Sequence, residues 1–151
     1  MTELTNGSSF EVVFIPTANV KSVYPLVVKE VAETLAKAEN GYDHNDILKE
    51  LSDGNMNLWI VFDKLNNKKL AFIISEIIER PKFKFISIFM TIGENRKLWE
   101  NESQEVLEKF ALRNNCKKAM LLARKGWSKS FKQTGYKNTH ILLEKSLTKG
   151  S

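Results

Sequence analysis

The chain has 151 residues, an ordinary share of apolar residues and a formal net charge of +5. Its length suits one core, and we expect a single domain over residues 1–151. The apolar runs are far shorter than the roughly 20 residues of a membrane helix, and no basic head precedes an apolar stretch at the N-terminus, so we expect neither a membrane span nor a signal peptide. The one cysteine, Cys116, excludes an internal disulfide framework, and with His44 and His140 it offers no metal-ligand spacing.

The first third of the chain predicts a strand followed by two helices. Residues 10–15, FEVVFI, combine β-branched and aromatic residues and stop at Pro16, which is typical of a strand. A helix is expected over residues 20–38, with Pro25 in its first turns. Its apolar residues recur with helical spacing: Val23, Val27, Val31, Leu35 and Ala38. Asp43 can then cap a shorter helix that ends at Gly54.

The middle of the chain predicts three antiparallel strands. Residues 57–63 and 69–79, NLWIVFD and KLAFIISEIIE, are joined by a short turn and form a hairpin. The Arg-Pro pair at 80–81 breaks the chain, and residues 82–93 return as the next strand.

The last third predicts a long helix, a strand, a short helix and a closing strand. The long helix runs from about Lys97 to Asn114. Four of its apolar residues share one face: Val106, Leu107, Phe110 and Ala111. KKAMLLA at 117–123 predicts a strand, and NTHILLEKSL at 138–147 predicts the closing strand. A short helix is expected in the stretch ARKGWSKSFKQTGY, residues 123–136, which lies between them. The order of elements indicates an α+β fold with a mostly antiparallel central sheet, flanking helices and one strand–helix–strand crossover near the end.

Charge is distributed unevenly along this order. Residues 109–151 contain eleven Lys and Arg against one acid, Glu144, whereas residues 1–108 contain twelve basic and seventeen acidic residues. A lysine-rich solvated surface is the ordinary explanation. The alternative is a phosphate-bearing ligand or a nucleic acid that binds the basic C-terminal part.

Several stretches resemble the GNAT superfamily of acetyl-CoA-dependent N-acetyltransferases over nearly the whole chain, from about residue 10 to residue 147. The most specific are EKFALRNNC, at the end of the long helix, and FKQTGY, where the family has a Tyr followed by EKxGF. SDGNMNLWIV, ARKGW and GYKN…LLEKSL resemble, more narrowly, GNAT-like proteins of tailed bacteriophages. The resemblance implies a mixed sheet whose fourth and fifth strands are parallel neighbours that separate, with the long helix between them.

The family binds acetyl-CoA through a glycine-containing loop at the N-terminus of this helix, where backbone N–H groups meet the pyrophosphate. By the family's spacing that loop falls on residues 95–100. Leu98 and Glu100 then occupy the two positions that the family keeps small, and the Glu100 carboxylate would repel a pyrophosphate. No glycine lies between Gly93 and Gly126 that could restore the loop. The basic residues that could still contact the cofactor are Arg96, Lys97, Arg124 and Lys125.

The family's catalytic tyrosine, which gives a proton to the departing thiolate, lies four residues before the Gly of its Gly-Phe pair. The matching position here is Phe131, four residues before Gly135, and phenylalanine has no proton to give. A carboxylate base could be Glu76 or Glu79, although exposed strand carboxylates are the commoner interpretation. Ser87 and Thr91 could assist it as polar groups. For Trp99 and Trp127, core packing is favoured over ligand stacking.

Two functions of different classes therefore stay open. The first is a non-catalytic or weakly catalytic phage protein, used in the particle, in head assembly or in contact with the host, with its basic part facing phage structural proteins or nucleic acid. The second is a divergent acetyltransferase that binds acetyl-CoA and acts on an unknown amine. The resemblance places either one in the host cytoplasm or the virion, and without catalysis no cofactor is expected.

Overall fold

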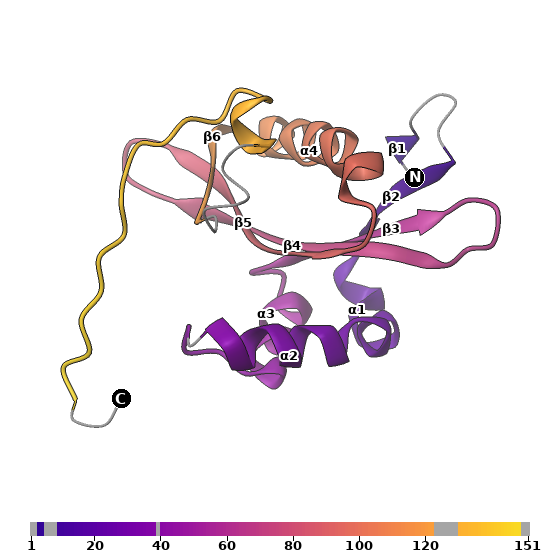
Figure 1. Cartoon of the computed structure of the whole chain (residues 1–151), viewed down its shortest axis with the longest axis horizontal. Coiled ribbons are helices and arrows are strands. Elements are labelled where there is room, and N and C mark those ends of the chain that lie inside the picture. Colours follow the sequence, from indigo (N-terminus) through magenta and orange to yellow (C-terminus); the bar gives the residue numbers. More distant parts are fainter. Residues whose placement is uncertain (1–2, 5–8, 39, 123–129, 149–151) are drawn as a thin grey trace.

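The computed structural model describes residues 3–4, 9–38, 40–122 and 130–148, which fold around one mixed sheet (Figure 1). Six strands lie in the order β1-β2-β3-β4-β5-β6, the same as their order along the chain. Their bounds are Glu3–Leu4, Phe10–Ile15, Asn57–Asp63, Lys69–Glu79, Lys84–Gly93 and Cys116–Leu121. Neighbours from β1 to β5 are antiparallel, and β5 and β6 are parallel.

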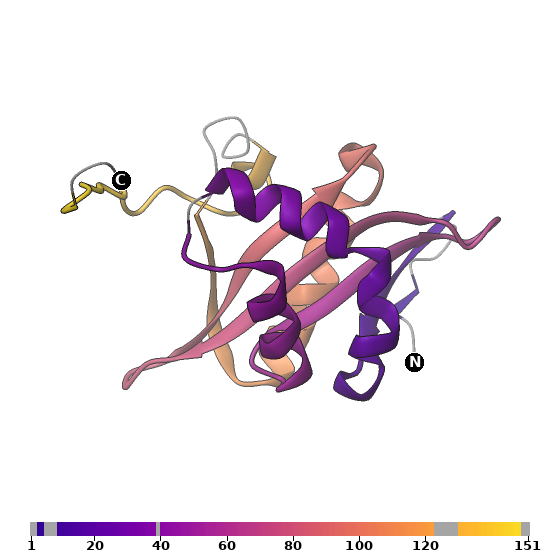
Figure 2. The same cartoon turned by 90° about the horizontal axis from the view of Figure 1, so that it is seen from below.

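Helices cover both faces of the sheet (Figure 1). One face carries α1 (Thr17–Val23), η1 (Tyr24–Leu26), α2 (Val28–Ala38) and α3 (His44–Ser52), which Figure 2 shows from their own side. The other face carries α4 (Arg96–Arg113). Each face has its own apolar cluster, because successive strand residues point to opposite sides. No helix within the described ranges has the length and apolar character that a membrane crossing requires.

The prediction of one continuous helix over residues 20–38 was wrong, because the structure divides this segment. A single 3-10 turn, Tyr24–Leu26, separates α1 from α2. The physical reason is Pro25, which has no N–H to donate to the preceding turn. The capping prediction is confirmed: the Asp43 side chain accepts from the Asp46 backbone N–H, and the Asp46 side chain accepts from the Asp43 N–H, each at 2.9 Å.

The parallel pair β5 and β6 separates as expected. Pairing with β6 extends along β5 from Lys84 only to Ile88, although β5 continues to Gly93. Between β4 and β5 the register shifts at Ile74/Ser75, which makes Phe89 an extra residue in β5. Such a bulge bends a strand, and here it lies one residue beyond the last pair with β6. The helix α4 connects the two strands on the opposite side from α1–α3.

The C-terminal part differs from its prediction. Residues 130–132 are helical and turn at 133–135, as expected for the end of the short helix. Residues 138–147 are not a strand: they are extended, exposed and outside the sheet. A strand needs a hydrogen-bonded neighbour, and within the described residues this segment has none.

Candidate functional site

A small cavity lies between β5 and α4, at the point where β5 leaves β6. Its volume is about 20 Å³, roughly the space of one water molecule. Residues of β4, β5, α4 and the 130–135 turn line it: Ile73, Ile88, Thr91, Trp99, Glu100, Ser103, Gln104, Leu107 and Phe131. The bulge at Phe89 positions this lining, because it lets Ile88 and Thr91, three residues apart, both contribute to it.

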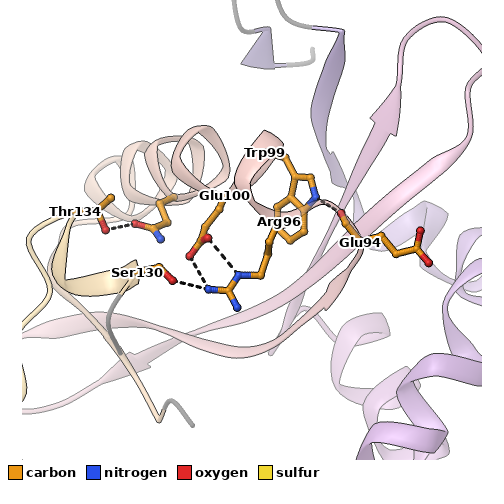
Figure 3. Close-up of polar contacts among 7 residues, drawn as sticks. Glu94, Arg96, Trp99, Glu100, Ser130 and Thr134 are labelled. Atoms are coloured by element: carbon orange, nitrogen blue, oxygen red, sulfur yellow. Dashed lines mark hydrogen bonds and ion pairs between the residues drawn. The ribbon is translucent and has the colours of Figure 1, made fainter. Parts of the chain in front are cut away.

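Two buried side chains of α4 bring polar atoms to this cavity. Ser103 and Gln104 are 2 % and 6 % exposed, and neither Ser103 Oγ nor Gln104 Nε2 has a hydrogen-bond partner. The other end of Gln104 is satisfied, since its Oε1 accepts from Thr134 Oγ1 at 2.6 Å (Figure 3). A buried polar atom without a partner costs about 1–3 kcal/mol, so the cavity favours a small polar guest.

The residue that precedes the first turn of α4, Asn95, has an unusual backbone conformation. Asn95 has a φ of 54°, in the left-handed region that asparagine tolerates better than most residues, and its side chain does not cap the helix. Trp99 follows in the first turns. It is 1 % exposed and donates its Nε1–H to the Glu94 carbonyl at 2.7 Å. The expectation that Trp99 packs in the core is confirmed, whereas Trp127 lies outside the described residues.

A polar bridge joins this helix start to the 130–135 turn (Figure 3). Arg96 donates from Nε and Nη2 to the two carboxylate oxygens of Glu100 at 3.2 and 3.3 Å, and from Nη2 to Ser130 Oγ at 2.6 Å. The Glu100 side chain is 12 % exposed. The carboxylate predicted to repel a pyrophosphate is therefore paired with Arg96, one of the residues predicted to contact the cofactor.

Phe131 closes the same region from the side of the turn. It is 4 % exposed, lines the cavity and meets the Tyr136 ring edge-on at a centroid distance of 5.1 Å. Burial, with the Glu108 carboxylate nearby, raises the pKa of Tyr136 to about 12. Phe131 therefore offers the cavity no ionisable proton. Because its pKa is raised, the neighbouring Tyr136 stays protonated at neutral pH.

The predicted catalytic candidates are divided between the two faces of the sheet. Glu76 and Ser87 lie opposite each other on β4 and β5. Ser75, the neighbour of Glu76, contacts Trp59 of the cluster under α4, so strand alternation puts Glu76 on the α1–α3 side. Burial, with Glu50 of α3 nearby, raises the pKa of Glu76. Thr91 lines the cavity under α4, and Glu79 is exposed at the end of β4. A concerted role for Glu76 and Thr91 at one reacting centre has no geometric support.

Glu76 instead borders a second, open cleft at the end of the sheet. Its volume is about 460 Å³. The lining comes from the α3–β3 connection, β3, β4 and α4: Gly54, Asn55, Asn57, Glu76, Ile77, Ile78, Phe110 and Asn114. This cleft shares no lining residue with the cavity under α4. The two openings are therefore separate sites.

The predicted cofactor-binding residues do not form a cradle in the part of the chain that is described. Arg96 is engaged in the bridge, and Lys97 is exposed on α4. Arg124 and Lys125 lie outside the described residues. Gly93 does not supply the missing phosphate glycine, because a Cβ there would lie 2.3 Å from the Ala71 Cβ and 2.8 Å from the Leu70 carbonyl oxygen. Its role is the close packing of β5 against β4.

The sequence did not point to four polar residues of this site: Ser103, Gln104, Ser130 and Thr134. Ser103 could have been found, because it lies one helical turn after Trp99 on the inward face. Ser130 and Thr134 could not, because their partners Arg96 and Gln104 are 34 and 30 residues away in the chain.

The chain matches no protein-family model and no curated protein by sequence. Solved acetyltransferase structures nevertheless share its fold. An aminoglycoside acetyltransferase from an uncultured soil metagenomic sample aligns over 93 % of this chain and 99 % of its own, with a TM-score of 0.70 at 9 % identity. Glucosamine-6-phosphate N-acetyltransferase from Arabidopsis thaliana aligns over 93 % and 100 %, with a TM-score of 0.67 at 12 % identity.

A further aminoglycoside acetyltransferase from a soil metagenomic sample, in complex with sisomicin, aligns over 93 % of this chain and 97 % of its own, with a TM-score of 0.66 at 11 % identity. At these identities the likeness concerns the fold alone. The expected fold is confirmed: the chain has the GNAT-like α+β architecture, with a mixed sheet, flanking helices and one parallel strand pair.

Within the described residues, the cavity under α4 does not fit acetyl-CoA, the cofactor that the fold implies. The cavity has room for about one water, the bridge from Arg96 spans the helix start and the turn, and no glycine opens the first turn of α4. The chemistry that remains available is hydrogen bonding by Ser103 and Gln104 inside a largely apolar pocket.

Proposed function

We propose that this GNAT-fold chain acts as a binding module and not as an efficient acetyltransferase. The observation that carries the proposal is the closure of the cleft under α4 by the chain's own side chains. Glu100 and Phe131 line this cavity, and Arg96 joins Glu100 to Ser130 of the adjoining turn. A ligand would have to break a charge-assisted contact and move a buried ring before it could enter.

The exposed basic residues of the C-terminal part supply the binding surface in this proposal. Lysines and an arginine of α4, β6 and the following segment are all exposed: Lys109, Arg113, Lys117, Lys118, Lys132, Lys137 and Lys145. Such a surface attracts a polyanion through many weak, salt-sensitive contacts. Its partner is nucleic acid or an acidic protein, and a role in a phage particle, in its assembly or in host contact stays a prediction from the sequence resemblance.

A divergent acetyltransferase is the second candidate, and one observation favours it. The parallel strands β5 and β6 separate beyond Ile88, as the acetyltransferase family resemblance implies. The cavity at that point contains the unpartnered Ser103 Oγ and Gln104 Nε2. A polar group of a ligand could satisfy both atoms if Phe131 moved. Such an enzyme would need a proton donor other than Phe131.

Calorimetric titrations with acetyl-CoA and with short duplex DNA separate the two candidates. The binding module is expected to give no resolvable heat with acetyl-CoA at millimolar concentration and a DNA affinity that falls steeply with salt. Lys117→Gln with Lys118→Gln should weaken DNA binding several-fold, whereas Lys21→Gln with Lys37→Gln, which removes the same charge from exposed N-terminal positions, should change it little. Micromolar, salt-insensitive acetyl-CoA binding would reverse the order of the two candidates.

A further inference from the structure

The second cleft, which Glu76 borders, occupies a gap at the end of the sheet. β3 begins at Asn57, opposite Ser75 of β4, whereas β4 continues to Glu79. Residues 76–79 therefore have β5 on one side and no described strand on the other. The cleft of about 460 Å³ lies beside this stretch, and its volume is in the range of pockets that bind small molecules.

Two helices end at this cleft. α3 and α4 lie on opposite faces of the sheet (Figure 1). Gly54 and Asn55, which line the cleft, directly follow the C-cap of α3, and Asn114, which also lines it, is the C-cap of α4. The C-terminus of an α-helix carries a partial negative charge, because its last carbonyl groups point out of the helix. Two such ends favour a cation in the cleft.

Glu76 brings a carboxyl group without a partner to the same place. It is half-buried, and no described residue donates a hydrogen bond to it or forms an ion pair with it. Burial and the Glu50 carboxylate both raise the pKa of Glu76, and no basic group in the described part of the chain opposes them. A half-buried carboxylate without a donor is costly, so a ligand that brings positively charged donors is stabilised there.

Two asparagine side chains add acceptors to the lining. Asn114 donates from Nδ2 to the Phe110 carbonyl at 2.8 Å, so the end of its amide that is left for a ligand is Oδ1, an acceptor. The Asn57 side chain forms no hydrogen bond within the described residues, and its Oδ1 is a further acceptor. The Phe110 ring and Ile77 add apolar surface. A guanidinium group fits this lining, because it has five N–H donors and no acceptor, and its plane stacks on aromatic rings.

We propose that the cleft at the end of β3 binds a guanidinium group, with the Glu76 carboxylate as its ionic partner and the Oδ1 atoms of Asn57 and Asn114 as further acceptors. The group belongs either to a free small molecule or to an arginine side chain of another protein, since both present the same chemistry. The site shares no lining residue with the cavity under α4, and it does not depend on the proposed function.

An NMR titration with butylguanidinium tests the proposal, because chemical shifts report where a weak ligand binds. The backbone amide signals of Asn57, Ile77 and Asn114 should shift and saturate in the millimolar range, whereas those of Ser103 and Gln104 under α4 should not move. Butylurea is a neutral analogue of nearly the same shape and should cause no saturable shift. Equal binding of butylurea, or no saturable shift with butylguanidinium, would overturn the proposal.

A matched pair of variants tests the role of the carboxylate. Glu76→Gln should weaken butylguanidinium binding about tenfold or more, since it removes the charge and keeps the size of the side chain. Glu79→Gln removes the same charge from an exposed position at the end of the same strand and should change the affinity less than about twofold. If both variants bind butylguanidinium as tightly as the unmodified chain does, Glu76 is not the partner and the proposed site is wrong.

N-acetylarginine amide, which carries the guanidinium on a peptide unit, distinguishes the two sources of the ligand. The backbone of β4 beyond Ser75 presents N–H and C=O groups that no described strand pairs, and these can bind a peptide. Tighter binding than that of butylguanidinium, lost in Glu76→Gln, supports an arginine side chain of a protein. Equal or weaker binding supports a free guanidinium compound. Failure of both probes refutes this site alone, because the proposed function is tested separately with DNA and acetyl-CoA.

Discussion

The two faces of the sheet bury similar numbers of large apolar side chains, yet they differ in what else they bury. Under α1, α2 and α3 the buried residues are hydrophobic, among them Leu58, Ile60 and Phe72, and the one unpartnered buried polar side-chain atom found there among the described residues is Ser52 Oγ of α3. The described residues that are both polar and buried, Ser75, Ser103 and Gln104, belong to the side of α4. That side also contains the cavity. The first face is packed mainly with apolar side chains, whereas the second contains a cavity at the point where the parallel strands β5 and β6 separate.

The largest expected effects probe the packed part of each face. Phe72→Ala and Trp59→Ala should each lower the free energy of unfolding by about 3–5 kcal/mol, because both side chains are essentially buried. Phe110→Ala should cost less than Trp59→Ala, since Phe110 is only half-buried in contact with Trp59. Urea denaturation measures all three. Equal costs for Phe110 and Trp59 would show that the α4 face is more tightly packed than the burial indicates.

The next effect concerns the approach of β5 to β4. Gly93→Ala should destabilise the protein by about 1–3 kcal/mol, because the new methyl group would overlap Ala71 and the Leu70 carbonyl oxygen. Adding Ala71→Gly should recover part of this loss but not all, since the carbonyl oxygen stays in place. Denaturation midpoints of the single and double variants check this. A Gly93→Ala variant as stable as the original chain would mean that β5 can move away from β4 without cost.

A matched pair of serines distinguishes a satisfied polar group from an unsatisfied one. Ser75 accepts a hydrogen bond from Trp59 Nε1 at 3.0 Å, whereas Ser103 Oγ has no partner. Ser75→Ala should cost about 1–3 kcal/mol, because it leaves the buried Trp59 N–H without a partner, and Ser103→Ala should be neutral or stabilising. The difference in unfolding free energy between the two variants is the measurement. A loss for Ser103→Ala as large as that for Ser75→Ala would indicate that an ordered water already satisfies Ser103.

The smallest effect is a pH dependence at the second cleft. Burial, aided by the neighbouring Glu50, raises the folded-state pKa of Glu76, so the fold favours the protonated carboxyl. The stability that this preference provides is complete below the unfolded-state pKa and is lost as the pH rises through the folded-state pKa. Glu76→Gln should therefore stabilise the protein slightly at neutral pH and not at acidic pH. Exposed Glu79→Gln is the control, and equal pH profiles for both variants would contradict the assignment.

Much of the fold follows from local sequence patterns. Alternation and β-branched residues predict the strands from 10 to 93, Asp43 predicts the start of α3, and the spacing of Val106, Leu107 and Ala111 predicts the buried face of α4. Local patterns failed where a long-range contact decides the outcome. Residues 138–147 have the composition of a strand, but no described strand lies beside them.

The candidate site was less predictable for the same reason. The bulge at Phe89 decides which face each β5 residue occupies, and a simple alternation through residues 84–93 cannot reveal it. It separates Ser87 from Thr91, which the sequence suggested as helpers at one site. The bridge from Arg96 to Ser130 joins segments 34 residues apart, so no local sequence pattern predicts it.

A calorimetric titration tests whether the chain's own side chains exclude acetyl-CoA. The cofactor is titrated into the unmodified chain and into a variant with Leu98→Gly and Glu100→Gly. The first turn of α4 then regains small residues, and Arg96 loses its carboxylate partner and can meet a pyrophosphate. We expect no resolvable binding at millimolar concentration for the unmodified chain and measurable, salt-sensitive binding for the variant. Micromolar binding by the unmodified chain, unchanged in the variant, would contradict it.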